Sequence, residues 1–183
     1  MEEQLRTLAK MQKLDDQIGA LRLLQQQLPQ ELNDIIERVD AATANLLGSE
    51  TERAETEKKQ RALEGEIKQN QATIKKYATQ LSDIKTNKEY KALNSEIAYL
   101  KDKISELESQ ELELMEEENM AKQKVEQDKK DLAAAEMTKR EREGDLREKI
   151  ESLDAEIDKL RAERTQLAQT LPQTQVALRG EMG

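Results

Sequence analysis

Residues 85–89, Lys85-Thr86-Asn87-Lys88-Glu89, lie between two long runs of heptad-spaced apolar residues that are out of phase with each other. Thr86 followed three residues later by Glu89 fits a capping box, in which the hydroxyl and the carboxylate accept hydrogen bonds from backbone amides at a helix start. Extending the first run past Ile84 would place three polar residues in its apolar seam, namely Lys88, Lys91 and Ser95. We therefore predict that one helix ends and another begins in this stretch.

Both runs have the alternating four- and three-residue spacing of a coiled coil. Between Leu32 and Ile84, eleven of the sixteen seam positions are apolar when Ala and Tyr are counted. The second seam runs from Leu93 to Leu171 and slips by one residue near Gly144. The sequence thus predicts two long helices, each with one apolar stripe.

A short connection makes two such helices antiparallel neighbours. Pairing residues whose numbers add to 174 sets Ile67 against Leu107 and Leu21 against Leu153, with the axis on Asn87. Sums seven higher or lower would also match seam with seam, and the cap at Thr86 selects this one. A parallel dimer of much longer helices is the alternative, but it would explain neither the phase break nor the cap.

We predict an all-α fold, a long antiparallel coiled-coil helical hairpin with its tip near Asn87. The predicted hairpin comprises residues 1–172, with arm one at 1–85, the tip at 86–88 and arm two at 89–171. Residues 173–183 are expected to form a flexible C-terminal tail.

A bend is expected near Pro29 and Gly144. Pro29 lies inside the first seam, where a helix-interior proline costs about 3 kcal/mol and kinks the helix. Its mirror position is near Gly144, where the second seam slips. The apolar stripe also widens around this level, which indicates a further contact with a folded-back first helix, a partner or a second copy. The widening residues are Leu23, Leu24, Ile36 and Leu47.

Composition excludes most kinds of catalytic and metal chemistry. The chain is 38% charged and 2% aromatic, and it has neither His nor Cys. Disulfides, thiolate and imidazole metal sites, and Ser-His-Asp or Cys-His catalysis are therefore absent. We expect no enzyme activity and no cofactor or metal. The first seventeen residues carry acids and bases without an uninterrupted apolar stretch, so we expect neither a signal peptide nor a membrane span, and a cytoplasmic location.

Two polar features interrupt the apolar pattern. Four successive seam positions are polar, namely Ser49, Arg53, Thr56 and Gln60. They indicate either a flexible zone or, as polar layers commonly do, a register-setting one. An acidic run without a basic residue follows in arm two, namely Glu106, Glu108, Glu111, Glu113, Glu116, Glu117 and Glu118. We expect it to form ion pairs with arm one, through Lys58, Lys59, Arg61 and Lys68, rather than to bind a cation or mimic nucleic acid.

The tip is basic, whereas the chain as a whole has a net charge of -9. Residues 75–91 hold five lysines against Asp83 and Glu89, a balance of +3. Such a surface suits an acidic protein or an RNA backbone. Alternatively, Tyr77 and Tyr90 fill the last seam layers while the lysines provide solubility. The candidate partner-binding residues are Lys85, Thr86, Asn87, Lys88, Glu89, Tyr90 and Lys91.

The tip sequence 86–93, TNKEYKAL, followed by Ser95-Glu96-Ile97, resembles the tip motif of a bacterial family that joins a coiled-coil hairpin to a C-terminal four-cysteine zinc ribbon. The opening residues 8–18 and the Leu28-Pro29 step are also similar to that family. The resemblance implies a cytoplasmic adaptor or chaperone-like protein. It implies as partners a sigma factor of the nitrogen-regulation class, flagellar or type III secretion components, and in one lineage messenger RNA.

The chain departs from this family pattern after Leu171-Pro172, because it reaches Gly183 without any Cys. We expect either that the ribbon was removed or that this member lost it, and the resemblance therefore does not carry zinc over to this sequence. We expect a non-enzymatic adaptor, monomeric or dimeric, that binds a protein partner through its tip and acts in transcription or in flagellar or type III secretion regulation. The alternatives are an RNA-binding regulator that uses the same lysines and a structural coiled-coil spacer.

Overall fold

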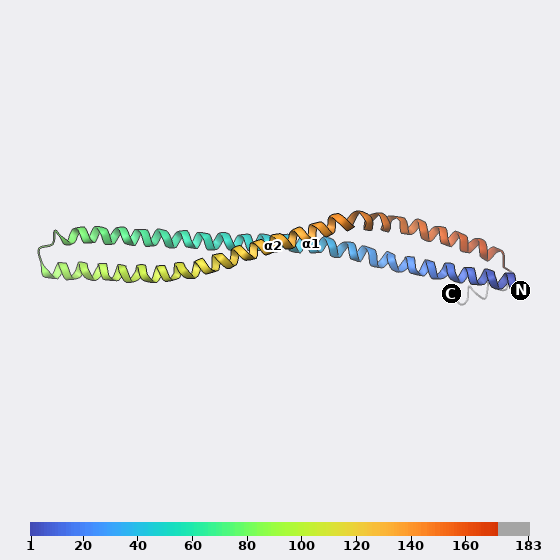
Figure 1. Ribbon diagram of the computed structural model, residues 1–183, viewed down its shortest axis with the longest axis horizontal. Coiled ribbons are helices and arrows are strands. Elements are labelled where there is room, and N and C mark those ends of the chain that lie inside the picture. Colours follow the sequence, from blue (N-terminus) through green and yellow to red (C-terminus); the bar gives the residue numbers. More distant parts are fainter. Residues whose placement is uncertain (172–183) are drawn as a thin grey trace. The chain divides into compact units, whose positions relative to one another are not determined.

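The computed structural model describes residues 1–171 and consists of two helices that pack as an antiparallel hairpin (Figure 1). Helix α1 spans Glu2–Leu81 and helix α2 spans Asn87–Gln169. The predicted all-α hairpin is confirmed, and the seams meet within the chain as the antiparallel arrangement requires. The predicted tail, 173–183, lies outside the described residues.

The arms contain two compact units. The tip unit comprises Ala42–Ala133, and the terminal unit comprises, among the described residues, 1–41 and 134–171. In the tip unit the core is formed by Ile67 of α1 with Ile104 and Leu107 of α2. The predicted partners Ile67 and Leu107 therefore belong to one buried cluster.

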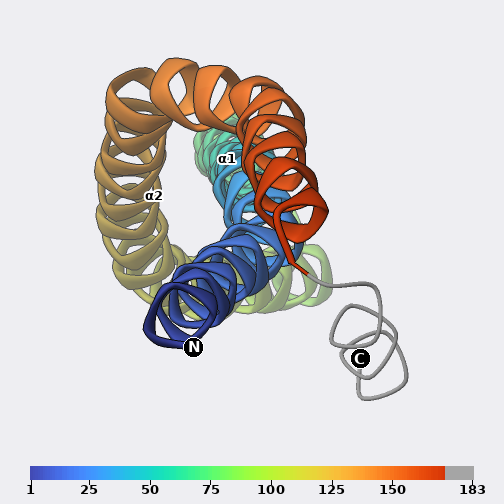
Figure 2. The same cartoon turned by 90° about the vertical axis from the view of Figure 1, so that its right-hand side faces the viewer.

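In the terminal unit the first turns of α1 and the last turns of α2 lie next to each other (Figure 2). Its core joins α1 and α2 through five buried residues, Leu28, Leu32, Ile35, Leu146 and Leu153, and Leu21 packs against them. Polar side chains link the same two arms: the Gln25 amide donates to Asp154 at 2.6 Å, and Arg142 and Arg164 pair with Glu31 and Asp15. Apolar burial thus runs along a single interface that is flanked by polar contacts.

Helix α1 runs through Pro29 without a break, and α2 runs through Gly144 in the same way. The first helix therefore does not fold back at Pro29, and the expected bend stays a prediction. The four residues that widen the apolar stripe differ in burial. Leu24 and Ile36 pack against the core of the terminal unit, whereas Leu23 and Leu47 are exposed. Only half of the stripe is thus available for a further contact.

The polar seam positions lie in the interface of the tip unit. Ser49 is 2% exposed, and its hydroxyl donates to the Leu46 carbonyl at 3.0 Å. Arg53 Nε lies 3.4 Å from Glu57 on the same helix. The Ser49 hydroxyl is therefore satisfied along α1, whereas the buried Arg53 Nε forms an ion pair with Glu57 but no hydrogen bond.

Candidate functional site at the hairpin tip

The turn between the helices is held by caps on both sides. At the end of α1, the Ser82 hydroxyl donates to the Thr79 carbonyl at 2.7 Å, and the Asp83 amide donates to the Gln80 carbonyl at 3.1 Å. These contacts occupy carbonyls that have no partner within a terminating helix. The first arm therefore ends four residues before position 85, where we had placed its end.

Thr86 is the N-cap of α2, as the capping motif predicts. Its hydroxyl accepts from the Glu89 amide at 3.3 Å, and its carbonyl accepts from the Tyr90 amide at 3.1 Å. Because an N-cap residue has non-helical dihedrals, α2 begins at the next residue, Asn87. Asn87 and Lys88, which we had assigned to the tip, are thus the first two residues of the second helix.

All seven candidate residues of the tip, 85–91, are exposed. We had considered that Tyr77 and Tyr90 both fill the last seam layers. Tyr90 is 46% exposed, so it does not do so. Tyr77 and Ile84 are half-buried and do cover the end of the interface. The tip is therefore a continuous solvent-facing surface that combines lysines with an aromatic ring.

The charge of this surface is not neutralised by neighbouring acids. Within residues 1–171, Lys85, Lys88 and Lys91 form no ion pair within 4.0 Å. Lys88 lies in the first turn of α2, where the helix dipole is positive and a basic side chain is unfavourable for helix stability. The lysines and the helix start therefore add to the same positive potential.

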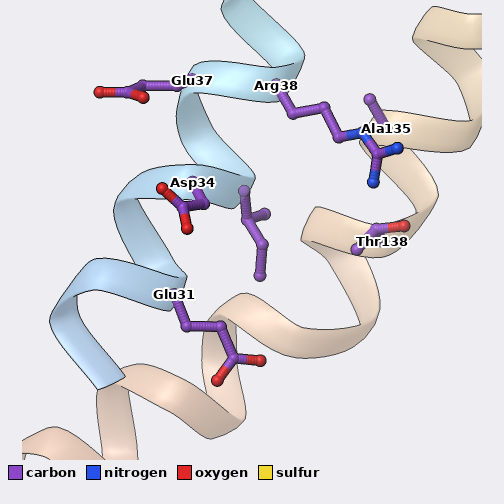
Figure 3. Close-up of a pocket in the computed structure, with 7 residues that line it drawn as sticks. Glu31, Asp34, Glu37, Arg38, Ala135 and Thr138 are labelled. Atoms are coloured by element: carbon purple, nitrogen blue, oxygen red, sulfur yellow. The ribbon is translucent and has the colours of Figure 1, made fainter. Parts of the chain in front are cut away.

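The described residues offer no constellation typical of an active site. No group of three metal-ligating side chains occurs within residues 1–171, and neither helix has a stretch long and apolar enough to cross a membrane. Figure 3 shows a shallow hollow of the terminal unit between α1 and α2, lined by Asp34 and Arg38 on one side and Thr138 on the other. Glu31 at its edge is paired with Arg142. This hollow lacks a nucleophile with an adjacent base.

Two antiparallel helices joined by a capped turn define a coiled-coil hairpin protein. More narrowly, the chain belongs to the family of the CT398-like coiled coil hairpin domain, whose model matches residues 11–179. The match supports the hairpin part of the family that the tip motif resembles. It does not test the zinc ribbon of that family.

Two solved structures share the fold. CT398 from Chlamydia trachomatis is 22% identical with a TM-score of 0.74, and the similarity covers 97% of this chain and 75% of that chain. The HP0958 protein from Helicobacter pylori is 19% identical with a TM-score of 0.64, covering 94% and 73% respectively. Comparison with the curated proteins gives no match. At these identities the likeness concerns the fold alone.

Proposed function

We propose that this chain is a non-enzymatic cytoplasmic adaptor or chaperone-like protein that binds an acidic surface of a protein partner through the tip of its hairpin. The observation that carries the proposal is the exposure of residues 85–91, which include three lysines without an ion-pair partner among residues 1–171. The capped turn fixes the backbone between the two helices, so little backbone ordering is needed on binding.

The chemistry of the tip suits a protein partner. Clustered positive charge accelerates the encounter with an acidic surface, and a half-exposed tyrosine supplies contact area with few rotatable bonds. Tyr90 lies between Lys88 and Lys91 in sequence, so the three side chains share the first turns of α2. The resemblance at the tip motif makes a sigma factor or a secretion component the partner class to test in the first instance.

RNA is the second candidate partner, and two exposed tyrosines favour it. Tyr90 and Tyr99 are 46% and 64% exposed on the first turns of α2, and a base stacks on such a ring while lysines follow the backbone. A structural spacer would need neither feature.

The test compares two triple variants with the same change in charge. The tip variant is Lys85→Glu, Lys88→Glu, Lys91→Glu. The control is Lys129→Glu, Lys130→Glu, Lys149→Glu, whose three lysines are also exposed and form no ion pair within the described part of the chain, 1–171. Helicity and melting temperature should stay near those of the parent in both, because exposed substitutions usually cost under about 0.5 kcal/mol each. Glu89 is kept because its carboxylate belongs to the capping box that the sequence predicts.

A partner is captured on the parent chain, identified by mass spectrometry, purified, and titrated against all three proteins. We expect the tip variant to lose binding at least about tenfold while the control retains it. Equal binding by all three proteins would reject the tip as the binding surface. Capture of RNA without a defined protein, with a steep dependence on salt, would favour the RNA-binding alternative.

A further inference from the structure

One exposed face of α2 in the tip unit carries two large apolar side chains where a coiled coil is normally polar. Leu112 is 66% exposed and Met115 is 55% exposed. Together with Asn119 and Lys122 they follow the spacing of one helix face, at i, i+3, i+7 and i+10. These four residues line a shallow hollow with Glu116 and Glu118. None of the four is in the seam that packs against α1.

Acidic side chains flank this apolar face. Glu108 and Glu116 are exposed, and Glu111 and Glu118 are half-buried along its seam-side edge. We had expected the acidic run to pair with lysines and an arginine of α1, and this expectation is wrong. Among residues 1–171, the only ion pair of the run joins Glu106 to Lys103 on the same helix, at 3.7 Å.

The missing ion pairs have a physical reason. An exposed pair is worth about 0–1 kcal/mol and must also order two long side chains, so exposed glutamates such as Glu108 and Glu116 gain little from forming one. Glu113 and Glu117 line a hollow with Lys59 of α1. Glu108 and Glu116 instead lie one turn before and one turn after Leu112 on α2, and within residues 1–171 they form no ion pair.

We propose that this face of α2, defined by Leu112, Met115, Asn119 and Lys122 with the flanking glutamates, binds a basic amphipathic helix of a partner protein. The face covers about three helical turns, or roughly 15 Å. An apolar stripe on the incoming helix would cover Leu112 and Met115, and its lysines or arginines would meet Glu108 and Glu116. Methionine suits such a surface because its unbranched, polarisable side chain adapts to different partners.

Charge complementarity decides between the possible occupants. A second copy that presented the same face would bring the uncompensated glutamates of both chains together, and like charges across an interface are strongly unfavourable. A basic helix gains attraction from the same groups. The inference goes beyond the tip, because it gives the hairpin a second, oppositely charged binding surface.

The probe is a fluorescein-labelled synthetic helix with two leucines four residues apart and lysines on both sides of them, titrated with the full chain and followed by fluorescence anisotropy. We expect saturable one-to-one binding. The variant Leu112→Gln, Met115→Gln should weaken it at least about tenfold. The variant Glu108→Gln, Glu116→Gln should weaken it and flatten its dependence on salt.

The matched control is Met120→Gln, Met137→Gln. Both methionines are exposed on α2, at 71% and 60%, and neither lines the hollow. The control should bind within about twofold of the parent. The tip variant, with three lysines replaced by glutamate, should also bind the probe undiminished, so failure of this proposal and failure of the tip proposal are distinguishable.

Three results would overturn the proposal. The first is the absence of saturable binding. The second is an equal loss of binding in Leu112→Gln, Met115→Gln and in the control Met120→Gln, Met137→Gln. The third is binding that persists in Leu112→Gln, Met115→Gln and so depends on charge alone. Analytical sedimentation tests whether a second copy of the chain occupies this face instead. A dimer of the parent chain that dissociates when Leu112 and Met115 are replaced would make the second copy the occupant and overturn the proposal.

Discussion

Leu153 of α2 offers the sharpest test of the packing in the terminal unit. It is 1% exposed and belongs to a cluster with Leu28, Leu32 and Leu146. Leu153→Ala removes the end of a fully buried side chain and leaves a cavity, which in protein cores costs about 2–5 kcal/mol. The interface of two helices is one layer deep, so its neighbours relax more easily than in a globular core. We expect a loss of about 3 kcal/mol in the free energy of unfolding.

The assay is urea unfolding followed by circular dichroism, with Leu112→Ala as the control for the same chemical change on the same helix. Leu112 is 66% exposed, so its replacement should change stability by less than about 0.5 kcal/mol. If both variants shift the unfolding midpoint equally, Leu153 is not buried by α1, and the pairing of arms in this unit is refuted.

Two further perturbations address the path of the chain. Ile67→Cys with Leu107→Cys should close an intramolecular disulfide under oxidation, because both side chains lie in one core cluster and a disulfide requires Cβ atoms about 4 Å apart; only intermolecular links on a non-reducing gel would contradict the antiparallel hairpin. Pro29→Ala should raise the melting temperature, because the helix continues through Pro29 and a proline there costs up to about 3 kcal/mol relative to alanine. A lower melting temperature would show instead that the proline ring makes contacts that outweigh its backbone cost.

The sequence predicts the interface well because heptad spacing selects one face of each helix. Ile67, Leu107 and Leu153 are all buried, as their seam positions require. Met11, at 1% exposed, lies three residues before the buried Leu14 and so continues the same spacing toward the start of α1. Thr86 could be identified as a cap from the sequence because a threonine followed by a glutamate three residues later supplies hydrogen-bond acceptors for backbone amides at a helix start.

Three features were beyond the sequence pattern. The end of α1 depends on Ser82 and Asp83, whose contacts with the last turn are individually weak and carry no periodic signal. We predicted ion pairing of the acidic run only from its position opposite basic residues of α1. The net energy of an exposed ion pair is close to thermal energy, so such side chains need not form one. The face around Leu112 and Met115 escaped notice because a search for seam positions ignores the other faces of the helix.

The capped turn also determines the order in which the hairpin can assemble. Five residues separate the helices at the turn, whereas more than a hundred separate Leu32 from Leu146. Closing the longer loop directly from the unfolded chain costs about 3 kcal/mol more conformational entropy. Pairing should therefore nucleate beside Thr86 and spread toward the termini, with each formed layer shortening the loop that the next must close. Substitutions at the turn then act mainly on the folding rate, and those around Leu153 on the unfolding rate.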